Sequence, residues 1–247
     1  MSATPLIRFE HVTKRYRDHV ALDDVSLDVF DGELLVVIGR SGSGKTTLLR
    51  ATNGLVVPDS GRVVVGSTTV ARGGDLSTFR RGIGYVIQSG GLFPHMTVAQ
   101  NVAILGRARG EPIEKQNARV AEVLATVGLS SLESRRPSEL SGGQLQRVGI
   151  ARALYADPPV LLLDEPFAAV DPIARMDLQD EFARLHRQLR KTMIFVTHDV
   201  EEALYLGDRV VVFDEGRIVQ IDAPDALRSN PASEYIARFL RRRGSVR

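Results

Sequence analysis

The sequence predicts an α/β fold built on a buried, largely parallel β-sheet with helices on both faces. Short apolar segments, such as 34–38 and 160–163, are typical of strands buried on both faces, and they alternate with segments of helical periodicity. Two other regions add to this core. The first 30 or so residues favour a small antiparallel β-subdomain, and the stretch between Gln88 and Leu140 is mostly helical in pattern, as an inserted helical subdomain would be.

Six segments and one hairpin are expected to form strands. Residues 25–30 alternate apolar and polar side chains, as a half-exposed strand does, whereas 34–38 is apolar throughout. Asp214-Glu215-Gly216 supplies the turn signal of a hairpin. The expected strands are 25–30, 34–38, 63–65, 83–87, 160–163 and 193–196, and the hairpin pairs 209–213 with 217–221.

Six helices are expected between these strands. Gly54 and Gly128 each end one, because glycine adopts the conformation that follows a helix C-terminus. Pro158 stops another, and Pro172 suits the first position of a helix that Asp171 caps. The expected helices are 45–53, 97–109, 113–127, 143–156, 172–190 and 200–206. The arginines at 241–243, after an amphipathic segment at 235–240, are interpreted as a frayed and solvated end.

Composition narrows the class of protein. The 247 residues are 43% hydrophobic and 25% charged, which is ordinary for one large globular domain or a domain with a subdomain. The absence of cysteine excludes disulfides and thiolate metal sites. The apolar runs are too short to cross a bilayer, and the N-terminus has no signal-peptide pattern, so a soluble intracellular protein is expected. A net charge of +2 does not favour binding to nucleic acid.

The clearest chemical motif is the glycine-rich turn that joins the strand 34–38 to the helix 45–53. It matches the P-loop pattern G-x-x-x-x-G-K-[ST], in which backbone N–H groups cradle phosphates. Lys45 would contact the β- and γ-phosphates, and the Thr46 hydroxyl can ligate Mg²⁺. A chance glycine-rich turn is the alternative, but the strand before it and the helix after it weigh against chance. The motif consists of Gly39, Arg40, Ser41, Gly42, Ser43, Gly44, Lys45 and Thr46.

Two other motifs fit a nucleoside triphosphatase. The buried strand 160–163 runs into Asp164 and Glu165, so that Asp164 could hold Mg²⁺ while Glu165, facing the other way, polarises an attacking water. Alone, this motif could equally be an acidic turn. Residues 140–144, which read LSGGQ, place a serine and two glycines before a helix, a second anion site. One chain does not need two such sites for one nucleotide, which indicates a symmetric dimer.

With the LSGGQ run in place, the sequence resembles the ATP-binding subunits of ABC transporters, from about residue 7 to about residue 240. The resemblance implies the ABC ATPase fold, ATP and Mg²⁺ as ligands, and a head-to-tail dimer that sandwiches two nucleotides. It extends the nucleotide site to Thr47 and has Ser141, Gly142, Gly143 and Gln144 contact the nucleotide held by the partner chain. Glu165, His198 and Lys45 become the catalytic residues, and Thr46, Gln88 and Asp164 the magnesium ligands.

Four residues gain roles from this resemblance alone. Tyr16 matches the aromatic residue that stacks on adenine, and Gln88 matches the glutamine that touches Mg²⁺ and couples to the membrane subunit. Asp171 matches the D-loop aspartate at the dimer interface, and His198 the histidine that contacts the γ-phosphate. Without the family, Tyr16 would be a packing residue, Asp171 a helix cap and His198 an ordinary polar residue. The D-loop has Val170 where leucine is commoner, from which little effect is expected.

Further motifs, 88–98 and 164–167 among them, resemble the bacterial uptake group for quaternary amines such as glycine betaine, carnitine and choline. The expected organisation is a single ABC domain over 1–247, with a helical subdomain at about 89–157 and a C-terminal helical tail at about 223–247. Many members of the group also carry a pair of CBS domains, which are not expected in this chain. Leu92, Phe93 and Met96 would then line a groove that receives a helix of the membrane subunit, where the alternative is a simple surface loop.

The implied partners are a second copy of the chain, integral membrane permease subunits and, through them, an extracytoplasmic solute-binding protein. The implied location is peripheral, on the cytoplasmic face of the inner membrane, with no nucleic-acid partner. Three other functions remain open at this point: the ATPase of an importer for another solute, that of an exporter with separate membrane subunits, and a soluble ABC ATPase acting on DNA or ribosomes.

Overall fold

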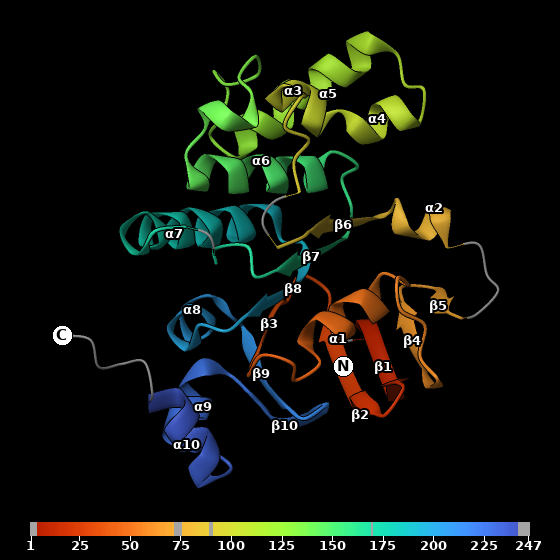
Figure 1. Cartoon of the computed structure of the whole chain (residues 1–247), viewed down its shortest axis with the longest axis vertical. Coiled ribbons are helices and arrows are strands. Elements are labelled where there is room, and N and C mark those ends of the chain that lie inside the picture. The colour runs from red at the N-terminus through yellow and green to blue at the C-terminus, as the bar shows by residue number, and fades with distance from the viewer. Residues whose placement is uncertain (1–3, 72–75, 89–90, 169, 242–247) are drawn as a thin grey trace. The chain divides into compact units, whose positions relative to one another are not determined.

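A computed structural model describes residues 4–71, 76–88, 91–168 and 170–241 (Figure 1). Its contacts divide the chain into two compact units, Met1–Arg80 with Lys191–Arg247, and Arg81–Arg190. Among the residues that the structure describes, no helix has both the length and the apolar character needed to cross a membrane. The predicted helical subdomain at 89–157 falls in the second unit, with residues 89 and 90 outside the described part.

The first unit contains the antiparallel sheet expected from the first 30 or so residues. Its strands lie in the order β2-β1-β4-β5, and the pairing of Tyr16 with His19 closes a tight turn between the first two. Alternate side chains of β1, such as Phe9, are buried. The segment predicted at 25–30 is the second half of a longer strand, and β5 was not predicted. The bounds are β1 Pro5–Tyr16, β2 His19–Phe30, β4 Ser60–Val65 and β5 Thr68–Val70.

The same unit contains four strands in the order β10-β9-β3-β8. All six residues of β3 are buried, and β3 is parallel to both β8 and β9, whereas β10 is antiparallel to β9. The register pairs Ile38 with Thr197 and Gly39 with Phe213, so the carboxyl ends of three strands meet at one edge. This edge positions the phosphate-loop motif. The bounds are β3 Leu34–Gly39, β8 Thr192–Thr197, β9 Arg209–Asp214 and β10 Arg217–Asp222.

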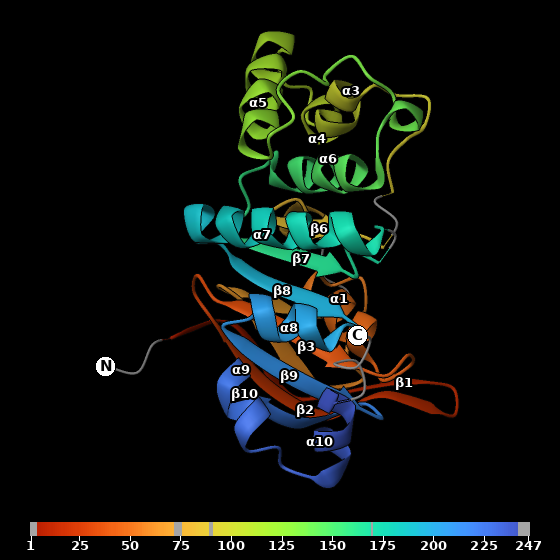
Figure 2. The ribbon, with the colours of Figure 1, turned by 90° about the vertical axis from the view of Figure 1, so that its left-hand side faces the viewer.

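Helices α1, α8 and α9 pack on these strands, and Figure 2 shows α8 beside β3 and β8. The amphipathic segment at 235–240 forms most of α10, whose Ile236 is fully buried. The arginines predicted to fray at 242 and 243 lie outside the described residues. The helices of this unit are α1 Lys45–Thr52, α2 Ser77–Arg80, α8 Val200–Leu206, α9 Pro224–Ser229 and α10 Glu234–Arg241.

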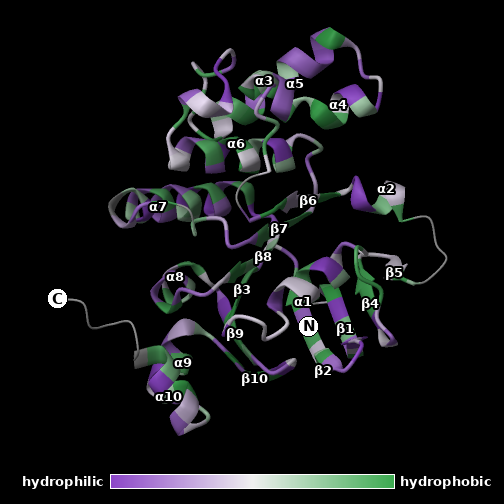
Figure 3. Ribbon diagram, in the orientation of Figure 1, coloured by the Kyte–Doolittle hydropathy of each residue, from purple (hydrophilic) through white to green (hydrophobic). Residues whose placement is uncertain are grey.

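The second unit pairs strand β6 in parallel with β7 and is otherwise helical, as the sequence predicts. Helix α6 lies between α7 and the group α3 to α5 in both views (Figures 1 and 2). Hydrophobic and hydrophilic residues alternate along α5, α6 and α7, as the mixed colours of these helices show (Figure 3). The elements are β6 Ile83–Val86, α3 Val98–Val102, α4 Ile104–Ala108, α5 Ile113–Thr126, η1 Pro137–Glu139, α6 Gly142–Leu154, β7 Val160–Asp164 and α7 Pro172–Leu189.

The single helix predicted at 97–109 is wrong, because it divides into α3 and α4 at Ala103. There the backbone has φ −76° and ψ 0°, which turns the chain although the helical hydrogen bonds from Ala103 N–H to Ala99 and from Arg107 N–H to Ala103 are kept. Apolar periodicity is the same on both sides of one such residue, so the pattern of the sequence carries no sign of the break.

Candidate functional site

The loop between β3 and α1 has the geometry of a phosphate cradle. Gly42 and Gly44 have φ of 80° and 109°, in the left-handed region that favours glycine. A Cβ at Gly39 would lie 2.1 Å from the carbonyl oxygen of Phe213, and one at Gly44 would lie 2.1 Å from that of Ala21. Neighbouring backbone therefore reserves these positions for glycine, and the loop is held tightly curled.

Two side chains of this loop are placed for an anion. Lys45 is 6% exposed, and its ammonium donates hydrogen bonds to the carbonyl oxygens of Gly39 (2.9 Å) and Arg40 (2.8 Å). The buried hydroxyl oxygen of Ser43 has no hydrogen-bond partner among the described residues. No side chain caps α1 at Gly44, and a helix N-terminus attracts anions. A phosphate group would satisfy all of these donors.

Beside the loop, the first unit contains a hollow of about 440 Å³. The turn after β9 borders it, and the Gly216 N–H donates a hydrogen bond to the carbonyl oxygen of Ser43 (2.9 Å), which fixes the turn to the loop. Tyr235 of α10 hydrogen-bonds to Asp214 of the same turn, and burial together with this carboxylate raises the pKa of Tyr235. The hollow is lined by His19, Val20, Arg40, Ser41, Gly42, Ser43, Asp214 and Glu215.

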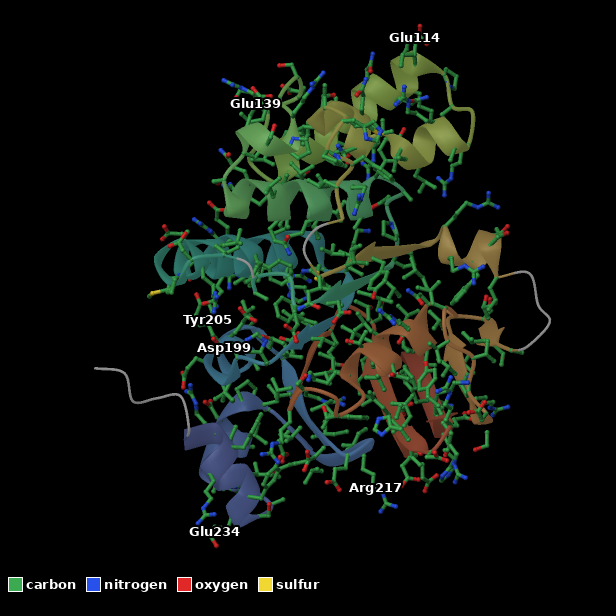
Figure 4. The ribbon with its side chains drawn as sticks, in the orientation of Figure 1. Glu114, Glu139, Asp199, Tyr205, Arg217 and Glu234 are labelled. Carbon is green, nitrogen blue, oxygen red and sulfur yellow. The ribbon has the colours of Figure 1, made fainter. Side chains whose placement is uncertain are left out.

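Tyr16 is 47% exposed at the end of β1, so its ring is not packed into the core. The Lys14 ammonium lies 5.4 Å from the centre of that ring. His198 is exposed directly after β8. The next residue, Asp199, is labelled in Figure 4; it caps α8 by accepting hydrogen bonds from the N–H groups of Glu201 (3.0 Å) and Glu202. Thr46 and Thr47 follow Lys45 in the first turn of α1 and are half-buried.

The second unit places the predicted carboxylates at the end of β7. Asp164 is 5% exposed, and the Tyr85 hydroxyl donates a hydrogen bond to it (3.4 Å). Glu165 lies beyond the strand with φ 46°, a left-handed conformation that is rare outside glycine. Because Glu165 lies beyond the end of β7, the turn sets the direction of its side chain. The Gln88 amide donates a hydrogen bond to the Glu165 carboxylate (3.2 Å).

The LSGGQ segment forms the start of α6. The Ser141 hydroxyl accepts a hydrogen bond from the Gln144 N–H (3.3 Å), and the Gln144 side chain accepts one from the Ser141 N–H (2.9 Å). This reciprocal pair is a capping box, which the sequence analysis did not anticipate. A Cβ built at Gly143 meets nothing within 4 Å, so the first turn of the helix is open on that side.

Asp171 acts as the predicted cap of α7. Its carboxylate accepts a hydrogen bond from the Ala174 N–H (3.0 Å), and its carbonyl accepts one from Arg175. Of the D-loop residues before Asp171, 169 lies outside the described part of the structure.

The family model described as ABC transporter matches residues 22–168, more than half of the chain. The chain is a member of the ABC transporter family. It is 45% identical to the glycine betaine/carnitine/choline transport ATP-binding protein OpuCA of Bacillus subtilis, over 95% of this chain and 62% of the relative. It is 47% identical to the sulfate/thiosulfate import ATP-binding protein CysA of Xanthomonas campestris, over 95% and 68%.

Among solved structures, the ATP-binding cassette MJ0796, in a dimeric post-hydrolysis state bound to ADP and Pi, is similar with a TM-score of 0.78 and 31% identity. The match covers 88% of this chain and 98% of that one. The predicted ABC ATPase fold is thereby confirmed. The chain spans about 62% of the length of the ABC transporter relative OpuCA.

Two glycines of the phosphate loop offer a matched test of the cradle. Gly42→Ala introduces backbone strain of about 1–2 kcal/mol, since φ is 80° and nothing lies within 4 Å of the new Cβ. Gly44→Ala adds the collision with Ala21 to a similar strain. We expect Gly44→Ala to lose clearly more free energy of unfolding, measured by urea denaturation, and to abolish binding of a fluorescent ATP analogue. Equal losses in the two variants would show that the close approach does not constrain the loop.

Proposed function

We propose that this chain binds ATP with Mg²⁺ and hydrolyses it as the ATP-binding subunit of an ABC importer. The phosphate loop carries the proposal. It gathers a buried lysine, a buried hydroxyl without a partner among the described residues and an uncapped helix N-terminus, all of which an anion would satisfy. When ATP binds, the Lys45 ammonium exchanges its carbonyl contacts for the β- and γ-phosphates, and Tyr16 stacks on the adenine.

The residues expected to hold Mg²⁺ are of the right chemical type. Thr46, Gln88 and Asp164 offer hydroxyl, amide and carboxylate oxygens, and magnesium is bound in such enzymes through few protein ligands together with phosphates. The described residues contain no group of three His, Cys, Asp or Glu side chains arranged for a metal, which fits an ion that arrives with its nucleotide. When bound, the ion neutralises charge on the phosphates.

For hydrolysis, Glu165 is proposed to accept the proton of the attacking water. Its hydrogen bond to Gln88 holds the carboxylate in one orientation and would be given up as the water binds. His198, exposed after β8, is proposed to contact the γ-phosphate and to support this step.

The second anion site is proposed to act on the nucleotide of a second copy of the chain. Ser141, Gly142, Gly143 and Gln144 would contact its γ-phosphate, with Asp171 at the interface, in a head-to-tail dimer. The similar cassette MJ0796 is described as dimeric and bound to ADP and Pi, which supports this proposal. ATP would favour the closed dimer because its phosphates contact both chains only in that state.

The transported solute is proposed to be a quaternary amine such as glycine betaine, carnitine or choline. The name of OpuCA and the motifs of the sequence support this class, although the 47% identity to a sulfate/thiosulfate relative keeps other small solutes in contention. The chain would act peripherally on the cytoplasmic face of the inner membrane, with permease subunits and an extracytoplasmic solute-binding protein as partners and no role in binding nucleic acid.

The turn after Gln88 is the proposed contact with the permease. Phe93 is 41% exposed, and its ring meets that of His95 edge-on at 6.0 Å between centres. Leu92 and Met96 are half-buried beside it. A short helix of the permease could cover the exposed aromatic ring and both aliphatic neighbours.

Glu165→Gln tests the proposed base. The amide keeps the size of the side chain but cannot accept a proton, so ATPase turnover should fall at least about 100-fold while ATP still binds. ATP should also drive the variant into a dimer that persists, visible by size-exclusion chromatography with light scattering. Turnover at the wild-type rate would remove Glu165 from this role.

Phe93→Ala tests the permease contact. We expect solute transport to be lost in the assembled importer while the ATPase rate of the isolated chain stays within about twofold of wild type, because the exposed Phe93 ring is not among the groups proposed to bind or hydrolyse ATP. The matched control is Ile113→Ala, which truncates an exposed apolar residue of the same unit, 58% exposed, at the start of α5. Unchanged transport by Phe93→Ala would refute the contact.

The solute can be settled by uptake assays in cells with and without the gene. Labelled glycine betaine, carnitine and choline should accumulate only when the gene is present, and labelled sulfate should enter equally in both. Gene-dependent uptake of sulfate alone would replace the quaternary-amine proposal. Gene-dependent efflux would indicate an exporter instead, and no effect on any solute would leave a soluble ABC ATPase.

A further inference from the structure

We propose that Asn101 and Arg152 are positioning residues that clamp the permease-facing turn, Phe93 to Met96, to the LSGGQ segment at the start of α6. When the permease displaces the turn, the turn would keep its shape and the LSGGQ segment would move with it. The inference rests on the proposed function, and all the contacts that carry it lie within the second unit.

The side chain of Asn101 holds the backbone of the turn through hydrogen bonds. It is fully buried in α3, and its side-chain oxygen accepts a hydrogen bond from the Phe93 N–H (2.7 Å). Its amide nitrogen donates to the carbonyl oxygens of Phe93 (3.1 Å), Met96 (3.3 Å) and Thr97 (3.0 Å). Only an amide side chain can both accept and donate in this way, so the shape of the turn depends on this residue type.

The first turn of α3 is in turn bonded to the segment that leads into α6. The Val98 N–H donates to the carbonyl oxygen of Arg135 (2.8 Å), and the Ala99 N–H donates to that of Glu133 (3.0 Å). These are N–H groups that a helix cannot satisfy internally. Glu139, labelled in Figure 4, lies two residues before Ser141. Its carboxylate accepts hydrogen bonds from the Arg136 N–H (2.6 Å) and the Arg135 guanidinium (3.0 Å).

Arg152 supplies a second connection from the opposite end of α6. Its guanidinium donates a hydrogen bond to the carbonyl oxygen of Gly91 (2.7 Å), two residues before Phe93. Burial lowers the pKa of Arg152, and hydrogen bonds from such a desolvated charge are among the stronger ones in proteins. The backbone at Gly91 has φ 53°, in the left-handed region that favours glycine.

These contacts form a closed ring. From Gly91 the chain passes through the turn to α3, whose start is bonded to the segment before Ser141, and α6 returns from Ser141 to Arg152 and so to Gly91. Ser141 and Arg152 are separated by about 17 Å along the axis of α6. Because Arg152 ties one side of the turn to α6 and the segment before Ser141 ties the other, we expect a push on the turn to move α6 with it.

Arg152→Gln removes one of the two connections and decides between positioning and mere structural support. In lipid vesicles that contain the chain with its co-purified membrane subunits, we expect stimulation of ATP hydrolysis by transport to fall at least fivefold. The ATPase rate of the isolated chain should stay within twofold of wild type, and the KM for ATP should not change. Arg152→Lys keeps a charged donor for Gly91 and should recover at least half of the stimulation.

The matched control is Arg147→Gln on the same helix, because the Arg147 guanidinium pairs with Glu181 of α7 (3.1 Å) and not with the turn. It should retain wild-type stimulation. Asn101→Asp, which keeps the acceptor for Phe93 and loses the donors, should reproduce the loss seen in Arg152→Gln, and the thermal midpoint of each variant shows whether it is folded.

Three results would overturn the inference: wild-type stimulation in Arg152→Gln, an equal fall of the basal and stimulated rates in it, or the same loss of stimulation in Arg147→Gln. Failure of the underlying proposed function would be seen differently, because the wild-type vesicles themselves would then hydrolyse no ATP.

Discussion

The buried ammonium of Lys45 is the constraint on which the phosphate loop depends. A charge that is 6% exposed must be paired or fully hydrogen-bonded, and here the carbonyl oxygens of Gly39 and Arg40 provide the bonds. They can do so only if the loop curls back over the lysine, which requires the backbone angles of Gly42 and Gly44. The curl is supported by the ends of the neighbouring strands, since backbone of Phe213 and Ala21 fills the space that any side chain would need.

In the second unit, the ends of helices and of strand β7 position the candidate functional residues. Asp171 and Ser141 are both residues of the proposed nucleotide site, and each caps a helix. Glu165 follows β7 in a left-handed conformation, and its carboxylate accepts a hydrogen bond from Gln88. A catalytic carboxylate with a fixed direction loses less entropy when it meets its water. The groups proposed to act on the nucleotide are thus set by local backbone geometry, and the helices and strands around them hold that geometry in place.

The sequence predicted the fold, and the place of the glycine-rich loop within it, because both depend on local patterns of residues. Apolar runs such as 34–38 mark buried strands, and the spacing of Gly39, Gly44 and Lys45 marks the loop between strand and helix. What it did not predict depends on single backbone angles or on residues far apart in the chain. The left-handed Glu165 and the break at Ala103 are of the first kind. Tyr85 beside Asp164 is of the second. Asn101 bonds to backbone only four to eight residues before it, but no motif marks it.

The capping box at Ser141 affects how readily the two chains of the proposed dimer separate after hydrolysis. In the single chain the serine hydroxyl is already engaged with the Gln144 N–H. The hydroxyl can donate to a phosphate while its oxygen still accepts from Gln144, and only a phosphate that pulled the oxygen away would have to compensate for a lost helix cap, worth about 1 kcal/mol. Once such a phosphate departs, the hydroxyl can return to Gln144 and recover that free energy. The start of α6 would then act as a small spring that favours separation of the two chains and readies each for the next nucleotide.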